Sequence, residues 1–140
     1  AERAARGQGT GALDGVTVGL PALTRAAKLG SRAARVGFDW PDPAAVLDKV
    51  REETDELQAE LARGDRARAQ EELGDLLFAL TQVARHLDID AEAALRAANA
   101  KFERRFRQVE AHLAGRGLTP RDVDMSELEA LWSRAKRELG

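Results

Sequence analysis

The sequence predicts an all-α protein, an antiparallel bundle of about four to five helices. Three observations carry this prediction. Apolar residues recur at three- and four-residue intervals along most of the 140-residue chain, as on the buried face of a helix. Proline, glycine and capping residues separate these periodic segments with short connections, which favour antiparallel neighbours. No alternation of apolar and polar residues is long enough to indicate a strand.

The first helix is expected after a polar stretch, residues 1–19, which is rich in glycine and lacks periodicity. We interpret 1–19 as a flexible arm or an interdomain linker. Because the chain begins with Ala1 rather than methionine, we expect a processed product or a piece of a longer protein. Residues 20–140 are then the helical domain, and its first helix runs to about Val36 and stops at Gly37.

Local capping and breaking residues place the next three helices. Asp42 is the expected N-cap and Pro43 the first residue of a helix that ends near Arg63, before Gly64. A helix over 66–87 follows. Asp90 is expected to cap another helix over 91–113, which a Gly-Arg-Gly sequence at 115–117 breaks.

The last helix is expected after a loop over 118–125. Ser126 and Glu129 have the spacing of a capping box, which opens a helix that runs to Leu139.

Composition excludes several classes of function. A net charge of −2 gives no general attraction to nucleic acids or anionic membranes. Without cysteine, disulfides, thiolate metal sites and cysteine nucleophiles are excluded. No apolar run approaches the roughly 20 residues of a membrane span. We therefore expect a cytoplasmic protein with no nucleic-acid or membrane partner.

Five carboxylates on two neighbouring predicted helices are the strongest functional signal. Glu53 and Glu56 share a helix face, as do Glu72 and Asp75, and Glu52 lies beside the first pair. If the two helices pack antiparallel, the clusters meet. Carboxylates so close repel one another unless a cation lies between them, and oxygen ligands suit Mg²⁺ or Mn²⁺.

Helical geometry indicates which way these carboxylates face. At about 100° per residue, Glu53 falls inside the apolar stripe of its helix, where an unpaired carboxylate is costly. Glu56 lies at the edge of that stripe, and Glu72 and Asp75 lie beside the next one. Two interpretations stay open, metal binding and salt bridges to nearby arginines. The expected stripes are formed by Val46, Val50, Leu57 and Leu61 and by Leu73, Leu76, Leu80, Val83 and Leu87.

Other catalytic arrangements find little support. A di-iron or di-manganese bundle pairs its glutamates with a histidine three residues on, whereas His86 and His112 follow Val83 and Val109. Neither histidine has a recognisable Ser-His-Asp context. The segment 7–11 lacks the lysine and the preceding strand of a P-loop.

These acidic clusters and their surroundings resemble the MazG-type nucleoside triphosphate pyrophosphohydrolases. The resemblance covers roughly residues 20–139, and the glycine-rich start is similar to the linker before the second repeat of a two-repeat MazG. The matching blocks are Glu52-Glu53-Thr54-Asp55-Glu56 and Glu72-Leu73-Gly74-Asp75, with Val36-Gly37-Phe38-Asp39-Trp40, Leu76-Leu77-Phe78, Ala84-Arg85-His86-Leu87 and Lys101-Phe102-Glu103-Arg104-Arg105-Phe106 in the family's order.

The resemblance implies hydrolysis of a nucleoside triphosphate between the α and β phosphates, which gives a monophosphate and pyrophosphate. It implies Mg²⁺, with Mn²⁺ as a possible substitute. The implied metal ligands are Glu53, Glu56, Glu72 and Asp75. Glu52 is implied to contact a second metal or to orient the attacking water as a base.

Substrate contacts are also implied. Lys101 and Arg105, on one helix face, are the expected phosphate and leaving-group contacts, with Arg104 beside them; the alternative is that they are solvated helix charges. Trp132 is expected to line the nucleotide pocket, or else to anchor the core. The remaining candidates are Lys136 on a phosphate, Asn99 on a base or ribose, and Arg68 on a phosphate or in a salt bridge.

The leading hypothesis is therefore a house-cleaning enzyme that removes unwanted nucleoside triphosphates. Family members form dimers or larger oligomers, so we expect a homodimer. A narrower enzyme would prefer one nucleotide, such as dUTP or dCTP. An alternative of another class is a nucleotide-binding or dimerisation module without catalysis.

Overall fold

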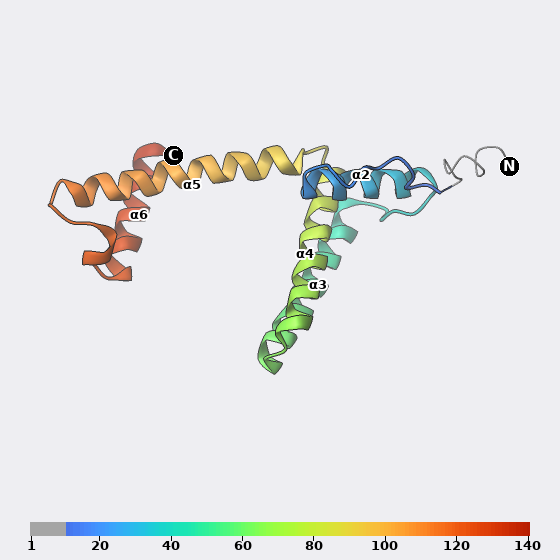
Figure 1. Ribbon diagram of the computed structural model, residues 1–140, viewed down its shortest axis with the longest axis horizontal. Helices are drawn as coiled ribbons and strands as arrows, with labels where there is room; N and C mark the ends of the chain where they lie inside the picture. The colour runs from blue at the N-terminus through green and yellow to red at the C-terminus, as the bar shows by residue number, and fades with distance from the viewer. Residues whose placement is uncertain (1–10) are drawn as a thin grey trace. The chain divides into compact units, whose positions relative to one another are not determined.

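The computed structural model describes residues 11–140, so the first ten residues of the predicted arm lie outside the described part of the chain. Across residues 11–140 the structure contains helices and no strand, which confirms the all-α class (Figure 1). The elements are α2 (Ala22–Arg35), α3 (Pro43–Arg63), α4 (Arg66–His86), α5 (Ala91–Ala114), the short 3-10 helix η1 (Pro120–Asp122) and α6 (Met125–Leu139).

The helices belong to two compact units, Ala1–Glu92 and Ala93–Gly140. The first unit contains α2, α3 and α4. The second contains most of α5, with η1 and α6. Each unit has its own packing and is described separately.

The antiparallel pair α3 and α4 is set by local backbone chemistry. Asp42 caps α3, and its carboxylate accepts a hydrogen bond from the Ala45 N–H at 2.9 Å. Gly64 ends α3 in the left-handed conformation, with φ of 71°, which glycine adopts without strain. Asp65 then caps α4 through the Arg68 N–H. This two-residue connection lays the helices side by side, as predicted (Figure 1).

The start of α6 differs from the prediction. Asp124, not Ser126, is the N-cap, and its carboxylate accepts a hydrogen bond from the Glu127 N–H at 2.9 Å. Both residue types cap helices well, and the earlier one begins the helix at Met125. The preceding segment, predicted as a loop, contains η1, which Thr119 and Asp122 stabilise by a capping box.

Helix α2 packs against the C-terminal part of α4 at a very close approach. Gln82 is fully buried, and its side-chain Nε2 donates a hydrogen bond to the Ala26 carbonyl at 3.0 Å. A side chain at Gly30 would place its Cβ 1.9 Å from Gln82 Oε1, so this position of α2 requires glycine. The amide of Gln82 thus replaces an apolar contact between the two helices.

An ion-pair cluster anchors the connection between α2 and α3. Asp39 accepts hydrogen bonds from both Nη atoms of Arg85, at 2.6 and 3.0 Å, and its Oδ1 lies 2.9 Å from His86 Nε2. The Arg85 guanidinium holds the pKa of Asp39 well below its usual range. The neighbouring Trp40 is thereby held near the α3–α4 pair.

The predicted apolar stripe of α4 is only partly buried. Leu73, Leu80 and Leu87 are about half exposed, and Leu61 of the α3 stripe is 65% exposed. The buried residues of α4 are instead Ala79, Thr81 and Gln82. The row of α4 that faces α2 and α3 thus includes polar residues, so the apolar pattern of the sequence did not identify the buried row.

The second unit has a small core between α5 and α6. Val109, Leu113 and Ala135 are buried there. Partly buried side chains surround them, namely Leu118, Val123, Leu128, Leu131 and Trp132. The connection between α5 and α6 contributes two of these side chains, Leu118 before η1 and Val123 after it.

Replacing Gly30 tests the α2–α4 contact. Gly30→Ala is expected to lower the free energy of unfolding by about 1–3 kcal/mol, because the added methyl group forces Gln82 out of its buried hydrogen bonds. Gly74→Ala is the matched control, since a Cβ at this helical position meets nothing within 4 Å. The control is expected to stabilise by about 0.5–1 kcal/mol. Urea unfolding measures both, and equal effects would contradict the account.

Candidate metal centre

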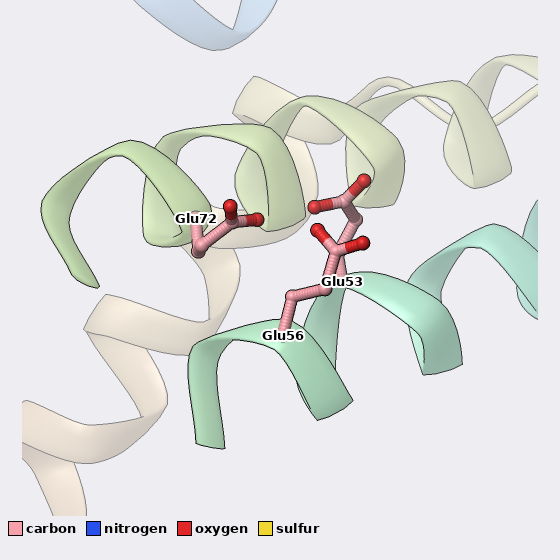
Figure 2. Close-up of side chains that lie close together, drawn as sticks. All are labelled: Glu53, Glu56 and Glu72. Carbon is pink, nitrogen blue, oxygen red and sulfur yellow. The ribbon is translucent and has the colours of Figure 1, made fainter. Parts of the chain in front are cut away.

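Three glutamates from the two packed helices meet at one point. Glu53 and Glu56 project from α3 and Glu72 from α4, and their carboxylate groups face one another (Figure 2). One oxygen from each residue lies within 4.8 Å of the other two. The antiparallel pairing predicted from the sequence therefore brings three of the four predicted metal ligands together.

The cluster holds carboxylate oxygens without hydrogen-bond partners. The Glu53 side chain is only 5% exposed. Its Oε2 is buried and accepts no hydrogen bond from the described residues, and the same is true of Glu72 Oε2. Buried acceptors without partners are costly. A divalent cation coordinated by these oxygens removes that cost, so the donor set fits an ion that prefers oxygen ligands.

The cluster also perturbs proton binding. The carboxylates of Glu56 and Glu53 raise the pKa of Glu72 to about 7. The Lys49 ammonium, in contrast, lowers the pKa of Glu53. The neighbouring carboxylates thus favour the protonated form of Glu72, while Lys49 favours the ionised form of Glu53.

Lys49 is the cation nearest to the acidic cluster, and it was not among the residues predicted from the sequence. Its Nζ lies 3.0 Å from Glu53 Oε1 and 3.5 Å from Glu52 Oε1. The signal was present, because Lys49 precedes Glu53 by four residues on one helix. Such a pair is common on charged helix surfaces, and the burial of Glu53 is what sets it apart.

The other predicted residues of this unit lie around the cluster. Asp75 is outside the group of three but lines a shallow depression together with Glu53, Lys49 and Trp40. Glu52 is exposed and pairs with Lys49. Arg68 is exposed, and its Nε lies 3.9 Å from Asp65 Oδ2, an ordinary surface ion pair.

The predicted phosphate and base contacts belong to the second unit. There the Arg105 guanidinium lies 5.9 Å from the centre of the Trp132 ring and donates a hydrogen bond to the Gly140 carbonyl at 3.0 Å. Its Nε is buried without a partner among the described residues. Trp132 also contacts Phe102, at 5.2 Å between ring centres. The exposed residues of the set are Asn99, Lys101, Arg104 and Lys136.

The described helices do not include one that is long and apolar enough to cross a membrane.

Comparison with known proteins identifies the family. Residues 42–110 match the family model of the MazG nucleotide pyrophosphohydrolase domain. Over 139 residues, 98% of the chain, the sequence is 50% identical to a protein of Escherichia coli (strain K12) named nucleoside triphosphate pyrophosphohydrolase. The chain belongs to the MazG family. The resemblance inferred from the acidic motifs is thus confirmed.

More distant relatives support the same assignment to MazG. A Thermotoga maritima protein named nucleoside triphosphate pyrophosphohydrolase/pyrophosphatase MazG is 38% identical over 117 residues, 84% of this chain. The chain spans about half the length of these two relatives, 52% and 45% respectively. The uncharacterized protein YabN of Bacillus subtilis is 42% identical over 65 residues, which are 46% of this chain and 13% of YabN.

Proton uptake by Glu72 predicts an unusual pH dependence for the metal-free MazG chain. The pKa of Glu72 is about 7 in the folded state, above the ordinary glutamate value of 4.5. Between these pH values the folded state binds more protons than the unfolded state. The stability that protonation of Glu72 gives to the folded state is therefore lost as the pH rises through about 7. Glu72→Gln is expected to remove this loss and to exceed the wild type in thermal stability above pH 7.

Thermal unfolding in EDTA across this range measures the effect. If the melting temperatures of the wild type and Glu72→Gln changed in parallel with pH, the pKa of Glu72 would not be raised in the folded state, and the prediction would be wrong. Glu71→Gln is a matched control, since Glu71 is an exposed neighbour on the same helix.

Proposed function

We propose that this chain is a Mg²⁺-dependent nucleoside triphosphate pyrophosphohydrolase. It cleaves NTPs and dNTPs between the α and β phosphates and releases a monophosphate and pyrophosphate. The observation that carries the proposal is the group of three converging glutamates within the MazG domain, of which Glu53 and Glu72 each hold a buried oxygen without a partner among the described residues. The names of the E. coli and T. maritima relatives support the same reaction class.

Four acidic residues are the proposed ligands of the metal. Glu53, Glu56 and Glu72 supply the converging oxygens, and Asp75 completes the set from the depression that it shares with Glu53. All-oxygen ligands favour Mg²⁺, with Mn²⁺ as a substitute. A bound divalent ion supplies charge neutralisation for the polyphosphate and makes a coordinated water more acidic.

Glu52 is the proposed base or second metal contact. It follows Lys49 by three residues and is 58% exposed, so its carboxylate remains open to water while Glu53 is buried beside it. An exposed carboxylate next to a metal centre can orient water and accept its proton.

The second unit carries most of the proposed substrate contacts. Lys101, Arg104, Arg105 and Lys136 are the proposed phosphate contacts, and Arg68 of the first unit is a further one. Lys101 and Arg105 neutralise the leaving pyrophosphate, and Arg105 has a buried Nε that is free to donate. Trp132 lines an apolar depression with Phe102, suited to a base. Asn99 is proposed to contact the base or ribose.

A second copy of the chain is the proposed partner. Three leucines at seven-residue intervals, Leu73 and Leu80 of α4 and its C-cap Leu87, are about half exposed. Such a row on a helical pair is typical of surfaces that a symmetric dimer covers. We place the activity in the cytoplasm, where such an enzyme removes unwanted nucleotides from the pool.

The alternative is a nucleotide-binding or dimerisation module without catalysis. The acidic cluster speaks against it. Three carboxylates in mutual contact reduce stability, and a module that only binds or dimerises has no use for them.

Product analysis tests the proposal. The purified chain is incubated with a panel of NTPs and dNTPs, with Mg²⁺ or with EDTA. Monophosphate plus pyrophosphate is expected in the samples with Mg²⁺ and not in those with EDTA, because hydrolysis needs the metal to neutralise the polyphosphate. Glu53→Gln is expected to lower the rate by about 100-fold or more, equivalent to several kcal/mol of transition-state stabilisation.

Glu60→Gln is the matched control, since Glu60 is a buried glutamate of the same helix outside the cluster. Diphosphate plus orthophosphate would show a different bond being cleaved. Absence of any turnover would favour the binding-module alternative.

A further inference from the structure

Lys49 occupies an unusual place beside the acidic cluster. Its ammonium contacts the buried Glu53 at 3.0 Å, although the Lys49 side chain itself is 38% exposed. It lines the same depression as Glu53 and Asp75. On an isolated helix a lysine that precedes a glutamate by four residues forms the weaker of the two possible orders. The pair is therefore explained by the site rather than by helix stability.

The contact leaves the two oxygens of Glu53 in different states. Oε1 forms the ion pair with Lys49, whereas Oε2 is buried without a partner among the described residues. Lys49 thus compensates part of the negative charge and leaves one oxygen open. Among the described residues, no arginine or other lysine is paired with Glu53, Glu56 or Glu72 within 4.0 Å.

We propose that Lys49 is the counter-cation of the acidic cluster, and that it stabilises the metal-free protein while weakening the binding of a divalent cation. The proposal rests on the metal centre proposed above. It assigns to Lys49 an effect on metal affinity, separate from any contact with substrate.

Lys49 affects the metal-free and the metal-bound protein differently. In the described structure Lys49 is the only cation paired with the buried Glu53, so without a metal its loss leaves a buried carboxylate uncompensated. A bound divalent ion would supply that compensation and would be repelled by the ammonium. Removing Lys49 therefore destabilises the metal-free protein more than the metal-bound protein. By linkage, the affinity for the ion must rise.

Calorimetric titration of Mn²⁺ into the metal-free protein tests the proposal, without nucleotide and in an alkaline buffer that keeps the glutamates ionised. Lys49→Met and Lys49→Gln are expected to lower the dissociation constant by about tenfold and to lower the melting temperature in EDTA. Lys49→Gln keeps a hydrogen-bond donor for Glu53, which preserves a measurable protein if Lys49→Met fails to fold.

Two controls separate position from charge. Lys49→Arg retains the cation and is expected to bind Mn²⁺ like the wild type. Arg51→Met removes one positive charge from the same helix, where Arg51 is 73% exposed and paired with Asp48. It is expected to change the dissociation constant less than twofold, because exposed charges are screened.

Unchanged or weaker Mn²⁺ binding in both Lys49→Met and Lys49→Gln would overturn the role of Lys49. An equal gain in affinity for Arg51→Met would overturn it as well, since the effect would then be one of general charge. If the wild type itself bound no Mn²⁺, the proposed metal centre would fail, which is a different result from failure of the Lys49 proposal.

Discussion

The mutual repulsion of Glu53, Glu56 and Glu72 is the constraint on which the rest of the structure depends. The fold forces it, because the two-residue connection at Gly64 and Asp65 aligns α3 and α4 so that their acidic positions face each other. The ammonium group of Lys49 offsets part of the repulsion, and the crowding of carboxylates raises the pKa of Glu72. Buried oxygens remain without partners nonetheless, and these are the features of a site arranged for a cation.

The surroundings of the cluster keep this arrangement in place. Gln82 and Gly30 fix α2 on α4, and the ion pairs of Asp39 hold the connection that carries Trp40. These contacts are polar and join residues far apart in the sequence, while the apolar side chains of α4 are divided between an inner and an outer row. A small core supported by polar contacts is consistent with the proposal that a second copy of the chain covers the outer row.

The sequence predicted the elements well where a single residue decides the outcome. Asp42 and Gly64 have one plausible role each, and both were predicted correctly. Asp124 and Ser126 are both good caps, so the start of α6 depended on packing that local chemistry does not encode. The exposed half of the α4 stripe was missed for a similar reason, since Leu73 and Leu80 fit an inward face as well as an outward one.

The candidate metal centre was likewise predicted only in part. Periodicity placed Glu53 inside an apolar stripe, and its burial agrees, whereas the importance of Lys49 emerged only from that burial.

A crystal structure of the protein with Mn²⁺, solved with anomalous diffraction, tests the central claim most directly. The account predicts an anomalous peak coordinated by Glu53, Glu56 and Glu72. Carboxylates paired only with lysine or arginine side chains, without a peak, would contradict it.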